Sequence, residues 1–241
     1  MRADGSTALR AAAYVLVAPS RWDAIDLLVA GGVAAGTVGS YLLDVEASDL
    51  MERNLSSFND DLTNIAVEYG SGYLAIGLPV VMYTYGFVSK DNWVRETAVL
   101  MGTAVLLTSA TITIGKIVIG RARPYTGLGR HEFKPFKGWA DFMSFPSGHT
   151  MVAFALSAVL AARIKNPWAS VGLYGAATAA AVTRMYSRDH WLSDLVFTAA
   201  YTTVVAHSIV DWFENGERSG EPKSRLNVVP TVNGVSVVWR F

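Results

Sequence analysis

The sequence predicts an all-α protein: a bundle of six transmembrane helices, preceded by a short interfacial helix and followed by a small β-hairpin. Hydrophobic residues make up 51% of the 241 positions and charged residues 17%, against about 25% charged residues in a typical soluble domain. The mean hydropathy is +0.30. Several stretches approach the roughly 20 mostly apolar residues that a membrane-spanning helix requires. We therefore expect an interfacial segment over 1–23, a six-helix membrane domain over 24–213, and a polar linker with a hairpin over 214–241.

The N-terminal segment is expected to lie at the membrane surface. Its apolar run 11–18 follows Arg2 and Arg10 and is similar to the hydrophobic region of a secretory signal peptide. Pro19 and Arg21 follow this run, where a signal peptide would carry small residues before its cleavage point. An interfacial helix leading into the first span is therefore the preferred interpretation.

Six nearly uncharged segments form the predicted bundle. They cover 27–43, 69–89, 97–115, 142–162, 166–183 and 195–210. The third and fifth are rich in Thr, Ala and Gly, which suits closely packed membrane helices, as does the pair Gly32 and Gly36 in the first. A soluble bundle with buried helices is the alternative, but six such segments in one chain favour the membrane.

The C-terminal region differs in composition from the bundle. Residues 214–224 are polar, as in a linker. The β-prone stretches 226–232 and 235–241 are separated by Asn233-Gly234, a strong signal for a two-residue hairpin turn. The sequence therefore predicts an appended hairpin, without indicating its role.

The distribution of Lys and Arg predicts the orientation in the membrane. Six spans put both termini on one side, where eleven Lys and Arg lie, against nine on the side of the first, third and fifth connections. Because Lys and Arg are enriched in cytoplasmic loops, the termini are expected in the cytoplasm. The opposite side would then be the periplasmic face of a bacterial-type inner membrane.

Polar residues with chemical potential cluster at that opposite side. Singly, each has an ordinary explanation, such as a lysine that reaches the headgroups, a helix cap or a solvated His–Asp pair. Together they supply three cations, a helix N-terminus, two histidines and an aspartate. These residues are Lys116, Arg123, Arg184, Ser147, Gly148, His149, His190 and Asp194.

This set of residues predicts phosphoryl transfer without a metal or other cofactor. The transition state spreads negative charge over the equatorial oxygens, which Lys116, Arg123 and Arg184 can bind. Ser147 and Gly148 open a helix, so their backbone N–H groups and the helix dipole can also point at the anion. The chain has no cysteine, which excludes thiol nucleophiles and cysteine-ligated metals.

His190 and His149 are the predicted reacting side chains. Asp194 follows His190 by one helical turn, so it can accept from one ring nitrogen and leave the other aimed at phosphorus. His190 would then be the nucleophile and form a phosphohistidine. His149 would protonate the leaving oxygen and later activate water.

The motifs around these residues resemble the type 2 phosphatidic acid phosphatase superfamily, which also contains vanadium haloperoxidases and bacterial acid phosphatases. Its pattern is K-x6-RP, PSGH and SR-x5-H-x3-D. Residues 116–124 and 146–149 match the first two motifs completely, and 183–194 match the third with Thr183 in place of Ser. The resemblance implies the same roles for the matched residues.

A phosphorylated membrane lipid is the substrate class that the resemblance and the six spans imply. Candidates are phosphatidic acid, phosphatidylglycerol phosphate, undecaprenyl pyrophosphate and lipid A phosphates. Arg130, Lys134 and Lys137 lie in the long third connection among aromatic residues and could contact anionic headgroups, although an ordinary surface loop explains them equally well. The formal net charge of zero gives no argument for a nucleic-acid partner, and the oligomeric state is not predicted.

Two other functions use the same anion pocket. One is a vanadium-dependent haloperoxidase, whose known members are generally larger and soluble. The other is a non-catalytic membrane protein that binds an anion. The complete set of reactive side chains favours the phosphatase.

Overall fold

The computed structural model describes residues 4–54, 56–217, 226–231 and 234–239. Residues 4–217 are all-helical apart from turns and loops, as predicted. The described α-helices are α1 (Asp4–Leu16), α2 (Ala24–Leu42), α3 (Asp44–Arg53), α4 (Ser57–Val67), α5 (Gly72–Val88), α6 (Asn92–Ile119), α7 (Gly148–Ile164), α8 (Pro167–Tyr186) and α9 (Leu192–Asp211).

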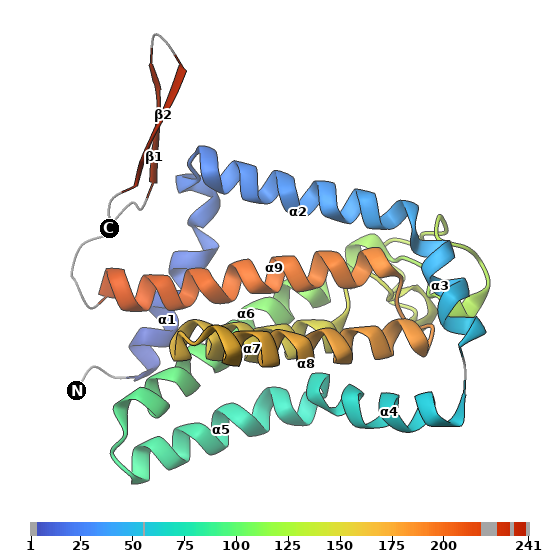
Figure 1. Ribbon diagram of the computed structural model, residues 1–241, viewed down its shortest axis with the longest axis horizontal. Coiled ribbons are helices and arrows are strands. Elements are labelled where there is room, and N and C mark those ends of the chain that lie inside the picture. The colour runs from blue at the N-terminus through green and yellow to red at the C-terminus, as the bar shows by residue number, and fades with distance from the viewer. Residues whose placement is uncertain (1–3, 55, 218–225, 232–233, 240–241) are drawn as a thin grey trace.

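The long helices run roughly side by side along the long axis of the molecule (Figure 1). α7 lies at the centre, packed against α6, α8 and α9. Side chains from these central helices, including Leu100, Met101, Leu156 and Ile209, form the main buried core. The loop between α6 and α7 gathers with α3 at one end of the bundle, and the N-terminus lies at the other end (Figure 1).

Local sequence signals set the ends of the helices that carry the polar cluster. The side chain of Ser147 accepts from the backbone of Thr150 and caps the start of α7. Gly120 caps the end of α6, and its φ of 59° lies in the left-handed region. A Cβ at Gly120 would come within 2.2 Å of the carbonyl oxygen of Lys134. Only glycine therefore lets the loop after α6 pass so close to the helix end.

Fewer helices than predicted have both the length and the hydropathy of a membrane span. Within the described residues these are Ala24–Leu42, Asn92–Ile119 and Leu192–Asn215, or four if Thr63–Gly70 and Gly72–Val88, bent by 57°, form one span. The predicted count of six is therefore not supported by these criteria. α7 is apolar but has 17 residues, about 25 Å of helix. α8 lacks charge over most of its length, but its Ala and Gly residues give it too little hydropathy.

The polar segment 44–68, which connects the first two predicted spans, is largely helical. It forms α3, α4 and the short 3-10 helix Glu68–Gly70, after which the chain bends into α5. These helices were not predicted, because the segment is charged and polar. They lie towards one end of the bundle and need no continuous apolar face.

The two ends of the chain also differ in detail from the prediction. α1 packs against α6 and α9, with Ala11 fully buried. The segment expected to lie at the membrane surface is therefore also part of the helical bundle. Strands β1 (Leu226–Thr231) and β2 (Gly234–Trp239) pair antiparallel, with Val228 opposite Val237. The predicted turn includes residue 233, which lies outside the described residues, so the complete hairpin stays a prediction.

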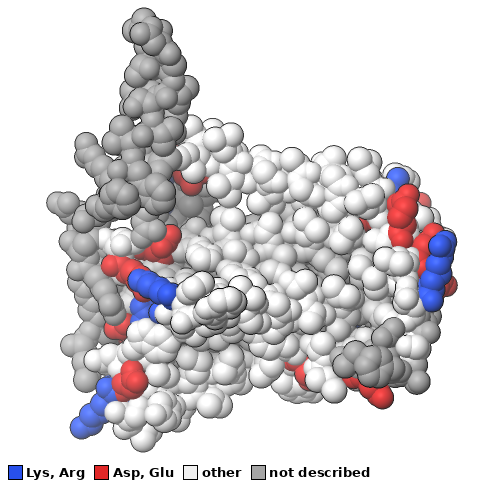
Figure 2. Space-filling model, viewed as in Figure 1, with Lys and Arg blue, Asp and Glu red and all other residues white. Residues whose placement is uncertain are grey.

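Charged side chains avoid the middle of the visible face of the bundle. In Figure 2 the Lys, Arg, Asp and Glu residues lie mainly near the two ends, with a broad uncharged belt between them. Many large apolar side chains are exposed on the bundle, among them Ile76, Val80, Leu106 and Val171. An uncharged belt of this kind is what a bilayer requires of the surface it covers.

Candidate active site

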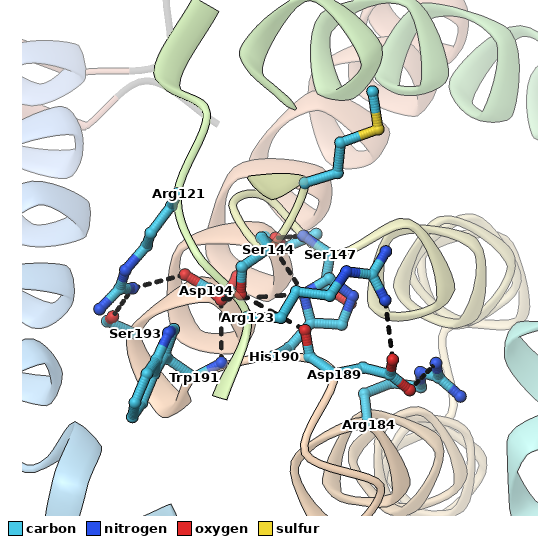
Figure 3. Close-up of polar contacts among 12 residues, drawn as sticks. Arg121, Arg123, Ser144, Ser147, Arg184, Asp189, His190, Trp191, Ser193 and Asp194 are labelled. Atoms are coloured by element: carbon cyan, nitrogen blue, oxygen red, sulfur yellow. Dashed lines mark hydrogen bonds and ion pairs between the residues drawn. The ribbon is translucent and has the colours of Figure 1, made fainter. Parts of the chain in front are cut away.

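The three sequence motifs meet at the end of the bundle opposite the N-terminus (Figures 1 and 3). The loop after α6 brings Arg123, the loop before α7 brings Ser144 and Ser147, and the α8–α9 junction brings Arg184 and His190. Their side chains gather in one small volume (Figure 3). The expectation that segments distant in the sequence surround a common point therefore holds for the geometry.

His190 lies buried at this point, with 3% of its surface exposed. Its Nδ1 is 2.5 Å from the carbonyl oxygen of Ser144, which requires Nδ1 to carry the proton and to donate it. No hydrogen bond to Nε2 is present within the part of the chain that the structure describes. Burial lowers the pKa of His190 below its ordinary value, although Asp194 opposes this effect. The ring is therefore neutral at pH 7 and presents an unprotonated Nε2.

Asp194 supports His190 less directly than predicted. Its Oδ2 is 3.7 Å from Nδ1, too far for a hydrogen bond. Oδ2 instead accepts from the Ser144 hydroxyl at 2.5 Å and from the Trp191 backbone N–H at 2.9 Å. The carbonyl oxygen of Ser144 is nearer and accepts the hydrogen bond from Nδ1–H. Ser144 thus bridges the carboxylate and the imidazole, which its side-chain type in the sequence did not reveal.

Arg123 and Arg184 converge on a carboxylate that the sequence reading did not assign to the site. Arg123 Nη1 donates to Asp189 Oδ1 at 2.7 Å, and Arg184 Nη2 donates to Asp189 Oδ2. Burial would raise the pKa of Asp189, but the Ser187 hydrogen bond and the two guanidinium charges lower it. Asp189 is therefore an anion held between two cations (Figure 3).

The two guanidinium groups retain donors that Asp189 does not use. Nε of Arg123 and Nε of Arg184 are buried and have no hydrogen-bond partner among the residues that the structure describes. A buried N–H group without a partner is costly, so both groups are suited to an additional acceptor such as a phosphate oxygen.

Lys116 and the start of α7 complete the surroundings of the site. Lys116 Nζ donates to the carbonyl oxygen of Met143 at 2.6 Å. The backbone N–H of Ser147 donates to Thr198 Oγ1 at 2.9 Å, so this group is engaged within the protein, in contrast to the expectation that it points at an anion. A Cβ at Gly148 would meet nothing within 4 Å, so the space next to its Cα is unoccupied by the described residues.

His149 lies on the first turn of α7 and is half-buried. It is close enough to Arg184, His190 and Lys116 for their charges to act on it. A Cβ at Gly70 would meet the carbonyl oxygen of His149 at 2.6 Å. The bend before α5 therefore packs directly against the backbone of this histidine.

The three predicted headgroup contacts have different surroundings. Arg130 Nη1 donates to the carbonyl oxygens of Tyr41 and Leu42 and so caps the end of α2. Lys134 lies over the rings of Trp139 and Phe142. Lys137 is exposed. Arg130 thus has a structural task that its position in a basic loop did not indicate.

Arg121 and Asp44 are further polar residues that the sequence reading missed. Arg121 lies within the spacer of the first motif and bonds to Asp194, and Asp44 follows the first apolar segment and bonds to Arg121. The sequence signals that could have identified them are a charged residue inside a motif, for Arg121, and a charged residue at the end of an apolar segment, for Asp44. Within the described residues, no group of three or more His, Asp or Glu side chains is arranged to hold a metal ion.

The chain thus forms a helical bundle with an uncharged belt, and residues of its three motifs surround a buried imidazole. Residues 97–218, about half of the chain, match the PAP2 superfamily. The chain belongs to this superfamily, as the motifs indicated.

Curated relatives of the chain include lipid A 1-phosphatases. The protein from Porphyromonas gingivalis is 24% identical over 175 residues, 72% of this chain and 35% of that protein. The protein from Rhizobium etli is 34% identical over 101 residues, 41% of this chain and 43% of that protein. The matches thus span less than half of these relatives' own length.

Two solved structures share the fold. A transmembrane PAP2-type phosphatidylglycerolphosphate phosphatase from Bacillus subtilis has a TM-score of 0.58 at 18% identity, over 78% of this chain and 91% of that chain. Aquifex aeolicus LpxE has a TM-score of 0.57 at 20% identity, over 70% of this chain and 95% of that chain. At these identities the likeness shows the fold alone.

Proposed function

We propose that this protein is a metal-independent phosphatase that hydrolyses a phosphomonoester or pyrophosphate on a membrane lipid. The observation that carries the proposal is the pair of buried, unpartnered Nε donors of Arg123 and Arg184 beside the buried ring of His190. A phosphoryl group placed between them would satisfy both donors and meet an unprotonated imidazole nitrogen. Membership of the PAP2 superfamily supports the same chemistry.

The first step of the proposed reaction transfers the phosphoryl group to His190. Nε2 attacks phosphorus, the P–N bond forms, and the bond from phosphorus to the lipid oxygen breaks. His149 gives a proton to the departing oxygen. Arg123, Arg184 and Lys116 stabilise the charge on the equatorial oxygens. The negative charge of Asp194 stabilises the positive ring of the phosphohistidine.

The second step returns the enzyme to its starting state. Water attacks phosphorus, His149 takes one of its protons, and the P–N bond breaks to release inorganic phosphate. His190 again becomes a neutral ring with its proton on Nδ1, held by the carbonyl of Ser144. The reverse roles of His149 in the two steps keep protons and electrons balanced.

Lipid A 1-phosphate is the first substrate we propose to test. The curated relatives that support it are named lipid A 1-phosphatases. Phosphatidylglycerol phosphate, phosphatidic acid and undecaprenyl pyrophosphate are the other candidates. Exposed aromatic side chains, including Phe136 and Trp139, belong to the α6–α7 loop that also carries Arg123, and they suit a headgroup region.

The proposed orientation puts the active site on the periplasmic side of a bacterial-type inner membrane, with α2 and α5 to α9 crossing together. α7 is short for a span, but its neighbours α6, α8 and α9 surround it, so little of it would need to meet lipid. The charge-poor belt in Figure 2 supports this arrangement.

Phosphate release from a panel of purified lipids tests the function. The full-length protein in detergent micelles is expected to release phosphate from at least one lipid phosphate, equally well with and without EDTA, and to be inhibited by vanadate. His190→Ala is expected to lower the rate by roughly 10³-fold or more, as for loss of a nucleophile. His207→Ala is the matched control, because His207 bonds to Tyr174 on a neighbouring helix of the bundle.

Three results would contradict the proposal. Activity that EDTA abolishes would indicate a metal mechanism, and full activity in His190→Ala would exclude the nucleophile. Tight phosphate binding without turnover on any lipid of the panel would instead favour a non-catalytic anion-binding protein.

A further inference from the structure

A buried ion network behind His190 connects the site to the first part of the chain. Arg121 Nη1 donates to Asp194 Oδ1 at 2.6 Å, and Arg121 Nη2 donates to Asp44 Oδ2 at 2.6 Å. The side chains of Asp44 and Asp194 have no exposed surface, and that of Arg121 is 3% exposed. The fully enclosed guanidinium thus lies between two enclosed carboxylates.

Asp44 is fixed by more than its contact with Arg121. Its Oδ1 accepts from the backbone N–H of Ser193 and its Oδ2 accepts from the Ser193 hydroxyl, both at 2.8 Å. Ser193 directly precedes Asp194, and its hydroxyl also accepts from Arg121. Asp44 therefore ties the start of α3 to the first turn of α9, where the supporting carboxylate of the site is located (Figure 3 shows the Arg121, Ser193 and Asp194 part).

Burial raises the pKa of Asp44, although its hydrogen bonds with Arg121 and Ser193 oppose this effect. With Asp44 ionised, the charges of this network sum to one negative charge. With Asp44 in place, Arg121 is shared between two carboxylates, and the group keeps an excess negative charge close to the ring of His190. Without Asp44, the pair Arg121–Asp194 would be neutral. Because interactions between buried charges are weakly screened, this difference acts on any positive charge that forms on the ring.

We propose that Asp44 is a positioning residue for the reaction at His190: through Arg121 it holds Asp194 in place and maintains the negative charge that stabilises the positively charged, phosphorylated ring. The proposal rests on the phosphohistidine mechanism proposed above. It assigns a role in the site to a residue that lies outside the segment 97–218 that matches the family.

Asp44→Asn tests the proposal, since Asn keeps the size of the side chain and can still accept from Ser193. We expect kcat to fall about tenfold, the rate equivalent of a change of about one unit in the pKa of the ring, with little change in KM. Asp49→Asn is the matched control, because Asp49 lies on the same helix and is exposed. It should leave kcat unchanged.

The titration of the His190 ring gives a second readout that does not depend on turnover. It can be followed by NMR on isotope-labelled histidine in the full-length protein, with His190→Gln to assign the signal. Removing a negative charge should lower the pKa of His190 in Asp44→Asn. Arg121→Gln removes the positive charge instead and should raise it. The other charged or titratable groups that act on this ring are Asp194, Lys116, Arg123, His149 and Asp189, and all stay unchanged in both variants.

Opposite shifts in the two variants are the expected result, because a purely structural role would not change direction with the sign of the removed charge. Equal ring titration in wild type and Asp44→Asn would overturn the proposal. If Asp44→Asn does not fold, Arg121→Gln decides alone: a raised ring pKa supports the proposal and an unchanged one overturns it. Failure of the phosphatase function would appear separately, as a wild type that releases no phosphate while its ring still titrates.

Discussion

Asp189 holds the two guanidinium groups of the site in one orientation before any ligand arrives. It bonds to Arg123 and Arg184 from two different parts of the chain, and its lowered pKa keeps it charged at neutral pH. Such preorganisation reduces the entropy that substrate binding must overcome. The same carboxylate also lies beside the proposed phosphate position, so it limits how much negative charge the pocket attracts.

Asp189→Asn is expected to lower kcat/KM for a lipid phosphate by about ten- to a hundredfold, because two charge-assisted hydrogen bonds that orient the arginines become weaker. Steady-state kinetics on the best lipid of the panel measures this change. Asp141→Asn is the control, since Asp141 is an exposed carboxylate of the neighbouring loop that bonds to Tyr125. Unchanged or increased kcat/KM in Asp189→Asn would mean that Asp189 merely competes with the substrate.

The structure brings together residues that the sequence singled out, but their hydrogen-bond partners were not predicted. His190, Arg123 and Arg184 could be recognised because their side-chain chemistry is specific and their spacing is fixed. Ser144 acts on His190 through its backbone carbonyl, a group that every residue carries, so no residue type marks it. Asp44 lies 149 positions from Ser193, and only the folded bundle brings the two together.

At the scale of elements, the break before α5 shapes the site from a segment outside the motifs. The helices on the two sides of the break differ in direction by 57°. Gly70, at the break, packs so closely on the backbone of His149 that no side chain fits between them. The position of the proposed general acid thus depends on a glycine in the connection between α4 and α5.

Gly70→Ala is therefore expected to displace His149 and reduce kcat by about tenfold or more, because small errors in the position of a reacting group are costly. The methyl group would lie 2.6 Å from a backbone oxygen, which cannot turn away as a flexible side chain could. Gly72→Ala is the control at the same break, where a Cβ meets nothing within 4 Å. Equal kcat values for both variants and wild type would show that the contact with Gly70 does not position His149.

Elements were predictable where hydrophobicity alone defines them. Each of the six apolar segments coincides largely with a helix, because a long uncharged run has few other ways to satisfy its backbone in a membrane. The helices α3 and α4 were missed, since their exposed polar residues resemble a loop. The absence of charge predicted more spans than length and hydropathy support, because Ala, Gly and Thr in α8 are uncharged without being strongly apolar.

At the scale of the whole molecule, the proposed mechanism requires that all parts of the site lie on one side of the bilayer. The α6–α7 loop, which carries Lys137, lies with α3 at one end of the bundle (Figure 1), where the α8–α9 junction carries His190. If α7 and α8 both cross the membrane, the turn between them faces the other side. If they do not, that turn stays on the side of the α6–α7 loop.

Single cysteines distinguish these arrangements, and the chain provides a clean background because it contains no native cysteine. We introduce Lys137→Cys, Lys90→Cys and Trp168→Cys, all at exposed positions, and label whole cells with a membrane-impermeant maleimide. Six crossings with cytoplasmic termini predict that Lys137→Cys is labelled from outside, whereas Lys90→Cys and Trp168→Cys react only after the membrane is permeabilised. Labelling of Trp168→Cys together with Lys137→Cys would show that α7 and α8 do not cross as a pair. The proposed active site would then lie in a bundle with fewer than six membrane spans.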